Sequence, residues 1–188
     1  IRAGAGTNFN VTQAIDSGVS QLTSSTTSNQ YSELARGIFC FTTSLLGAGA
    51  TVSAATLSIN NDRKLNGNGS PEWDLVAATP AATDTLANSD YAQLGSTVFA
   101  SLTYAGVTEE AYNDFAMDAN GIANLSLTSI SKYGTRLNWD TDNSFTGVWA
   151  SGATSGFYNY MADQTGTTQD PKLVVTFTRL AGFLILFS

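Results

Sequence analysis

Carboxylate and amide oxygens gather in one short stretch of the sequence, RLNWDTDNSFTGVWASG at residues 136–152. Asp140, Asp142 and Asn143 offer the hard oxygen ligands that calcium prefers. An EF-hand loop counted from Asp140 needs glycine at its sixth position, where this chain has Phe145, so the EF-hand itself is excluded. Two interpretations stay open: a looser calcium site at these three residues, or a turn whose side chains bond the local backbone.

Aromatic residues suggest a second chemistry, because aromatic rings stack on the apolar faces of sugar rings. The candidates for a glycan-binding surface are Trp73, Trp139, Trp149, Tyr158 and Tyr160. Aromatic residues that alternate with small ones in a β-sandwich also commonly fill the core. The sequence therefore leaves core packing and glycan binding open for each of these rings.

The residues on either side of DTDNS predict how two of the tryptophans lie. We expect RLNW at 136–139 and FTGVWAS at 145–151 to form adjacent antiparallel strands joined by the DTDNS turn. In that hairpin Trp139 and Trp149 would be buried or half buried rather than displayed on one surface.

This chain has few residues that could act as catalytic groups. There is no histidine, which removes Ser-His-Asp and Cys-His arrangements and the commonest zinc ligand. The single cysteine, Cys40, lies in the apolar run GIFCF and is expected to be a buried thiol. Glycoside hydrolysis needs two facing carboxylates, and the sequence does not pair any of its acidic residues in this way. We therefore expect a protein that is not an enzyme, with no cofactor other than the calcium ion considered above.

Net charge restricts the partners that the protein can bind. The 188 residues carry a formal charge of −7, and only 12% of them are charged. Nucleic acid is excluded as a partner, because its binding depends on Lys and Arg side chains that neutralise phosphates. Ser, Thr, Asn and Gly supply the solubility instead, a composition typical of extracellular or virion-surface β proteins.

Short strands are the elements that would position these residues. Apolar residues recur with period two in short segments separated by turn residues, and helical periodicity over three or more turns is absent. Strands are predicted near ARGIFCFT, ATLSIN, EWDLVAA, TVFASLTY, YNDFAM, GTRLNW, GVWAS, GFYNYMA and PKLVVTFT. This pattern predicts an all-β fold, a two-sheet antiparallel β-sandwich of jelly-roll type.

One stretch, residues 118–134, differs from the strand pattern. Leu127, Ile130 and Tyr133 fall at helical intervals, and Gly134 would end a helix. We therefore expect one short helix or 3-10 turn there.

The predicted domain division has three parts. An N-terminal arm takes residues 1–12, the sandwich domain takes 13–179, and an apolar C-terminal tail takes 180–188. Because the sequence starts at Ile1 rather than Met, we expect it to be processed or cut from a longer product.

Three segments follow one another in an order known from a protein family. They are RGIFCFTTSLLGAGATVSAATLSI at 36–59, ISKYGTRLNWD at 130–140 and DPKLVVTF at 170–177. Together they resemble the carbohydrate-binding-module-like β-sandwich family named after its DNRLRE motif. This chain has Thr42 where an aspartate is usual and Gly47 where a proline is usual, and it lacks the naming motif. The resemblance implies a jelly-roll-type sandwich as found in secreted, cell-surface and phage structural proteins, without catalysis.

The apolar tail predicts an assembly contact. Five consecutive apolar residues of high β propensity form its centre: Phe183, Leu184, Ile185, Leu186 and Phe187. Such a run aggregates unless it is covered. We expect it to add to a sheet edge of a neighbouring subunit or host particle, and the alternative is an edge of its own sandwich. The tail is far shorter than the roughly 20 residues of a membrane-spanning helix, so no membrane span is expected.

These observations together predict a non-enzymatic structural module on an assembled extracellular particle, such as a phage capsid decoration or fibre-type protein, that docks through its termini. Its partners would be copies of itself or other particle proteins, and its location the virion surface or the extracellular space. The alternative is a carbohydrate-binding module that recognises a surface or environmental polysaccharide. One protein can combine the two roles.

Overall fold

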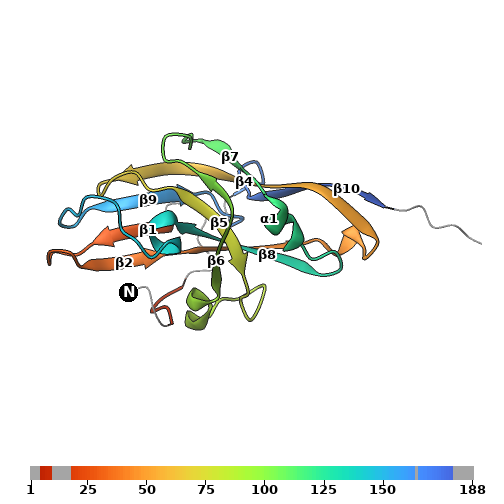
Figure 1. Cartoon of the computed structure of the whole chain (residues 1–188), viewed down its shortest axis with the longest axis horizontal. Helices are drawn as coiled ribbons and strands as arrows, with labels where there is room; N and C mark the ends of the chain where they lie inside the picture. The colour runs from red at the N-terminus through yellow and green to blue at the C-terminus, as the bar shows by residue number, and fades with distance from the viewer. Residues whose placement is uncertain (1–4, 10–17, 164, 180–188) are drawn as a thin grey trace, which may run out of the picture.

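Two antiparallel sheets pack face to face in the computed structural model, which describes residues 5–9, 18–163 and 165–179 (Figure 1). Apolar side chains from both sheets form the core between them. The predicted all-β class and the two-sheet antiparallel sandwich are therefore confirmed. Among the described helical turns, none is long and apolar enough to cross a membrane.

The larger sheet is built around the long strand β4. Its strands, in spatial order, are β10 (Lys172–Arg179), β4 (Ala50–Asn66), β9 (Thr154–Asn159), β1 (Gly18–Ser24) and β2 (Tyr31–Ala35), and β7 (Ala111–Ala116) also pairs with β4. Residues 56–58 of β4 pair with both β10 and β7, and Asn61 pairs with both β9 and β7. Because a strand has two edges, β9 and β10 share one edge of β4 and β7 takes the other.

The smaller sheet covers the inner face of the larger one. Its spatial order is β3 (Gly37–Thr42), β8 (Ile130–Leu137), β5 (Trp73–Ala78) and β6 (Leu94–Leu102). The short helical turns are η1 (Ser44–Leu46), η2 (Asn88–Ala92), α1 (Ala119–Ala123) and α2 (Asn138–Thr141).

Alternation along β4 shows how the sequence selects the two faces of this sheet. Leu57 and Ile59 are fully buried in the core, while Ser58 and Asn60 point to the outer face. The apolar residues therefore place the β4 inner face against the smaller sheet.

Trp73 lies at the centre of the core. Its indole is fully buried, stacks on Phe157 with ring centroids 4.9 Å apart, and meets Phe115 edge-on at 4.9 Å. Its Nε1 donates to Ser20 Oγ at 3.2 Å, and that hydroxyl donates to Thr135 Oγ1 at 3.0 Å. The indole N–H therefore has a hydrogen-bond partner inside the core, as buried polar groups usually do.

The short helix predicted within residues 118–134 is present as α1, but its expected position at Leu127, Ile130 and Tyr133 is wrong. Residues 130–137, including buried Tyr133, form the central strand β8, which pairs with β3 on one edge and β5 on the other. This pairing overrides the helical spacing of the apolar residues. The helical turn α1 lies earlier in the same stretch, where Asp118 accepts a hydrogen bond from the backbone N–H of Gly121 at 2.8 Å and caps its start.

The predicted hairpin is also wrong. Asn138–Thr141 form α2 directly after β8, and residues 142–153 form a loop that contains no strand. The helical turn directs Asp140 toward two arginines, a contact that a flat hairpin would not make. Trp139 is buried and Trp149 is half buried, as expected for these two rings.

Candidate functional site

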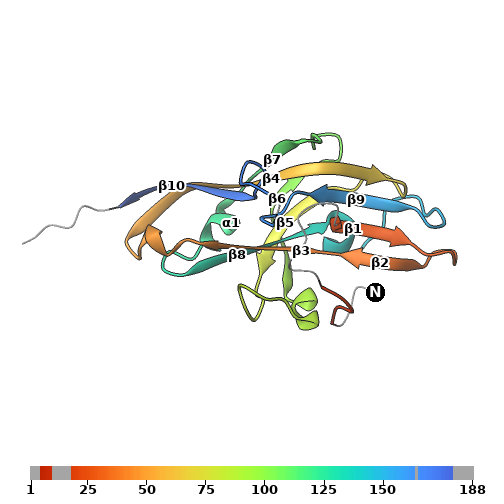
Figure 2. The same ribbon diagram turned by 180° about the vertical axis from the view of Figure 1, so that it is seen from behind.

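An apolar surface lies at the end of the sandwich where β10 finishes, on the right of Figure 1 and on the left of Figure 2. We call it the distal patch and define it as Leu45, Phe177 and Arg179. Leu45 is 84% exposed and Phe177 is 38% exposed. A hollow of about 490 Å³ lies here, lined by residues of the η1 turn and by Arg179. The distal patch therefore offers apolar side chains beside a concave surface.

The η1 turn builds this patch by separating two neighbouring leucines. Leu46 is buried in the core, whereas Leu45 points to solvent. Gly47 follows with φ of 79°, a left-handed conformation that glycine adopts without strain. Arg179 Nε donates to Leu46 O at 2.7 Å, and its guanidinium carbon lies 5.4 Å from the centre of the Phe177 ring. The end of β10 is thereby attached to the η1 turn.

β10 is an edge strand, since β4 is its only strand partner within the described residues. Leu173 and Val175 on its inner face are half buried, and Val174 on its outer face is exposed. The register with β4 shifts between Thr176 and Phe177, so the pattern of alternation changes near the end. An open edge presents unpaired N–H and C=O groups to which another strand can add.

The sequence continues from this patch into the predicted assembly contact. That contact lies outside the described residues: Phe183, Leu184, Ile185, Leu186 and Phe187. In the predicted N-terminal arm, residues 5–9 are described, and the backbone N–H of Gly6 donates to Asn88 O at 2.6 Å. The described part of the arm therefore contacts its own domain at η2.

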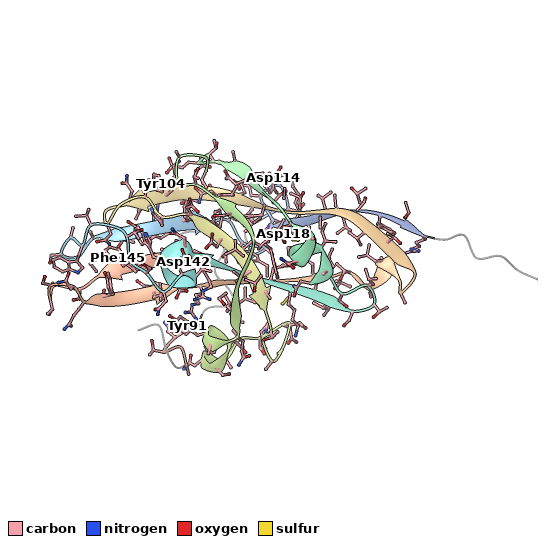
Figure 3. All side chains as sticks on the ribbon, viewed as in Figure 1. Tyr91, Tyr104, Asp114, Asp118, Asp142 and Phe145 are labelled. Atoms are coloured by element: carbon pink, nitrogen blue, oxygen red, sulfur yellow. The ribbon has the colours of Figure 1, made fainter. Side chains whose placement is uncertain are left out.

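A second hollow, of about 260 Å³, lies beside the loop 142–153 at the opposite end of the sandwich, where Figure 3 labels Phe145. Three rings contribute to its wall. Phe145 meets Trp139 nearly edge-on with centroids 4.8 Å apart, and Tyr31 at 59° with centroids 5.3 Å apart. Asn143 adds a polar group to the lining. The rings are inclined to one another and do not form a flat stacking platform.

The structure separates the predicted glycan-binding tryptophans. Trp73 is a core residue with no exposed surface, so it is removed from that set. Trp139 lines the 260 Å³ hollow, and its Nε1 donates to Thr146 Oγ1 at 3.0 Å. Trp149 lies on the loop outside the hollow and donates from Nε1 to Gln30 O at 3.0 Å.

The two predicted tyrosines lie elsewhere, at the end of β9. Tyr158 is half buried beneath the guanidinium of Arg63, which lies 4.5 Å from the ring centre. Tyr160 is buried and donates from its hydroxyl to Glu110 Oε2 at 3.0 Å. These rings and the tryptophans therefore do not form one surface.

Asp140, the first predicted calcium ligand, is held in a buried ion pair. Its Oδ2 accepts from Arg36 Nε and Arg136 Nε, both at 2.7 Å, and its Oδ1 accepts from Arg36 Nη2 at 2.8 Å. Burial alone would raise the pKa of Asp140, but the hydrogen bonds from the two guanidinium groups hold that pKa below its ordinary value. Asp142 and Asn143 are exposed and follow α2 in a turn. Calcium binding at Asp140 would require the loss of this ion pair, and binding at the other two residues stays a prediction.

Two acidic residues share one hydroxyl on the smaller sheet. The Ser101 hydroxyl lies 2.7 Å from Asp74 Oδ1 and 3.2 Å from Glu72 Oε2. Burial raises the pKa of Asp74, and the nearby carboxylates of Asp142 and Glu72 add to this increase. Within the described chain, no group of three or more His, Cys, Asp or Glu residues is arranged to hold a metal ion.

Sequence reasoning missed Asn68, which organises the loop 142–153. Its fully buried side chain accepts from Ser24 Oγ at 2.7 Å and from the backbone N–H of Ala150 at 3.1 Å, and it donates to Ala153 O at 2.8 Å. The sequence GNG at 67–69 indicates a turn at this asparagine but does not predict these contacts.

No family model, curated protein or solved structure matches this chain. The resemblance to the DNRLRE-type family therefore stays a prediction. The two hollows, one at each end of the sandwich, are the features that bear on function.

Proposed function

We propose that this chain is a non-enzymatic structural module that docks onto a neighbouring copy of itself in an assembled extracellular particle. The observation that carries the proposal is the exposure of Leu45 beside a hollow and an open strand edge. From Arg179, in the same patch, the sequence continues into the five apolar residues at 183–187.

Burial of the distal patch supplies a reason to dock. An exposed leucine alone is ordinary on a protein surface. Full burial of an exposed large apolar side chain contributes about 1.5–3 kcal/mol, so Leu45, which is 84% exposed, would contribute most of that amount and Phe177, which is 38% exposed, a smaller part. Exposed apolar side chains around a concave surface are a recurring mark of protein interfaces.

A second copy fits this surface because the chain carries both parts of a strand-addition contact. β10 offers an open edge, and residues 183–187 have the apolar, β-forming composition of an added strand. Strand addition obtains its affinity from main-chain hydrogen bonds and its specificity from alternate side chains. The low proportion of charged residues, 12%, favours the extracellular setting.

Matched serine substitutions test the patch. Leu45→Ser and Phe177→Ser remove apolar contacts from the distal patch, and Val148→Ser is the control, because Val148 is 76% exposed at the opposite end. We expect both patch variants to shift the protein toward monomer in a concentration series followed by light scattering, while the control assembles like the unchanged chain. Equal assembly in all of these proteins contradicts the proposal. Thermal melts report whether each variant is folded.

A second candidate function, glycan binding, is favoured by the 260 Å³ hollow. Its wall combines the rings of Tyr31, Trp139 and Phe145 with the amide of Asn143. Aromatic rings beside a hydrogen-bonding amide are the combination that a sugar ring needs, with its apolar face and its hydroxyl groups. This candidate concerns the end of the sandwich opposite the distal patch, so the two functions are compatible.

A glycan array tests this second candidate. Specific binding that is lost in Asn143→Ala and Phe145→Ala, but kept in Trp149→Ala, would place the sugar in the hollow. Binding that is instead lost only in Trp149→Ala would move it to the outer surface of the loop. The absence of binding to every glycan on the array would remove the candidate for those sugars.

A further inference from the structure

The larger sheet has a second open edge, at β2. Within the described residues β2 pairs with β1 alone, just as β10 pairs with β4 alone. An edge strand presents N–H and C=O groups to which another strand can add. The added strand of the proposed function, residues 183–187, therefore has two candidate edges in a neighbouring copy.

A row of opposite residues runs across the larger sheet to the β2 edge. Asn66 of β4 is opposite Ser155 of β9, Ser155 is opposite Leu22 of β1, and Leu22 is opposite Leu34 of β2. Leu22 is buried in the core, and Leu34 is half-buried and packs against it. Directly opposite residues share a face of the sheet, so a strand added to β2 would continue this core-facing row beyond Leu34.

The 260 Å³ hollow lies at the end of this row. Leu22 and Leu34 both line it, together with the rings of Tyr31, Trp139 and Phe145. An added strand would turn every second side chain toward the hollow, and all five residues at 183–187 are apolar, so either alternate set suits it. The run of five also equals the length of β2. The hollow beside β10 offers less, because none of its lining residues is aromatic.

Strand register shows that the run at 183–187 cannot reach the β2 edge of its own copy. Arg179, at the end of β10, is opposite Ala50 at one end of β4. The row of Leu34 meets β4 at Asn66, which is about 50 Å from Ala50 along the strand. Residue 187 lies within about 29 Å of Arg179, the extended length of the intervening chain. Figures 1 and 2 both place the end of β10 and β2 at opposite ends of the sandwich.

We propose that residues 183–187 of one copy add to the β2 edge of the next copy and cover the hollow beside Leu34. This inference rests on the proposed function, because it names the surface that accepts the tail. The distal patch of one copy then faces the hollow end of its neighbour. Such a contact joins two different surfaces, so it repeats and builds a ring or an open filament. Only the last copy of an open filament keeps its hollow free for another ligand, such as a glycan.

Two full-length variants that each lose one half of the contact test this inference. Leu34→Lys places a charge at the hollow and keeps the tail, whereas Ile185→Lys alters the tail and keeps the β2 edge. We expect each variant alone to be a monomer in sedimentation velocity. Their equimolar mixture should form dimers, because the intact tail of the first adds to the intact edge of the second. Thermal melts report whether each variant is folded.

The control is Val148→Lys, which places the same charge at an exposed residue of the same end that does not line the hollow. It should assemble like the unchanged chain. A mixture that stays monomeric overturns the head-to-tail contact. Assembly of Leu34→Lys like that of the unchanged chain also overturns it, while leaving the proposed self-assembly intact.

Hydrogen exchange on the unchanged chain keeps the test independent of any variant. In concentrated protein, compared with dilute protein, the amides of residues 31–35 should exchange about tenfold more slowly, because the added strand takes their hydrogen bonds. Oligomers in which these amides exchange as in the monomer overturn the proposal, and slower exchange at residues 172–178 instead would assign the tail to the β10 edge. A chain that stays monomeric at every concentration contradicts the proposed function and this inference together.

Discussion

Arg36 binds Asp140 through two parallel hydrogen bonds, from Nε to Oδ2 at 2.7 Å and from Nη2 to Oδ1 at 2.8 Å. Arg36 is the residue between β2 and β3, where the chain passes from the larger sheet to the smaller one. Asp140 lies in α2, directly after β8. The pair thus joins the point where the chain changes sheets to the end of the central strand of the smaller sheet.

The first prediction concerns the loss of this pair. Asp140→Asn leaves two buried guanidinium groups, on Arg36 and Arg136, without their carboxylate. We expect it to lower the free energy of unfolding by about 3–5 kcal/mol, the usual cost of breaking a buried ion pair. Denaturant unfolding measures this, and a loss below about 1 kcal/mol would show that the ion pair is not structural.

The second prediction concerns Asp74, an aspartate whose pKa is raised, whereas that of Asp140 is lowered. Burial raises its folded-state pKa, so ionising it costs stability at neutral pH. Asp74→Asn should therefore be neutral or stabilising above that pKa. Below the ordinary aspartate pKa the variant and the unchanged chain should have equal stability, because Asp74 is then protonated in both the folded and the unfolded state. A variant that is less stable at neutral pH would contradict this.

The third prediction concerns acid unfolding. The folded-state pKa of Asp140 is lowered, so its contribution to stability is complete above the ordinary aspartate pKa and is lost as the pH falls through the folded-state value. The unchanged chain should therefore lose stability at acidic pH more steeply than Asp140→Asn does. Parallel pH profiles of the two proteins would show that another group controls acid unfolding.

The fourth prediction separates two tryptophans that the sequence presented as equivalent. Trp73→Ala opens a cavity in the core and should cost about 3–5 kcal/mol. Trp149→Ala removes a half-buried ring with one hydrogen bond and should cost about 1 kcal/mol. Equal losses in denaturant unfolding would contradict the placement of these rings.

Strands whose core-facing residues are apolar could be predicted from the sequence. Strands with polar residues at core-facing positions could not. Eight of the nine predicted strand segments contain strand, and GVWAS does not. β1 was missed because Ser20 and Ser24 occupy the inward positions beside Leu22, so the period-two apolar signal is absent. Ser20 is buried because the Trp73 indole needs a hydrogen-bond partner, a pairing distant in sequence.

The candidate sites were also difficult to predict, because their contacts join residues that are far apart in the sequence. The residues near 140 were recognised as polar, but the partner of Asp140 is Arg36, which lies far away in the sequence. Arg179 of β10 and Leu46 of η1, which meet at the distal patch, are likewise far apart in the sequence. Local spacing identifies residue types that can bind, whereas strand pairing decides which of them meet.

The central claim is that the chain assembles with copies of itself through the β10 end, and sedimentation velocity of the full chain and of residues 1–179 tests it most directly. We predict concentration-dependent oligomers for the full chain. The shortened chain should be a folded, soluble monomer with an unchanged far-ultraviolet circular dichroism spectrum. If the shortened chain assembles as the full chain does, or if it unfolds, the residues after Arg179 are not an assembly contact and the claim is wrong.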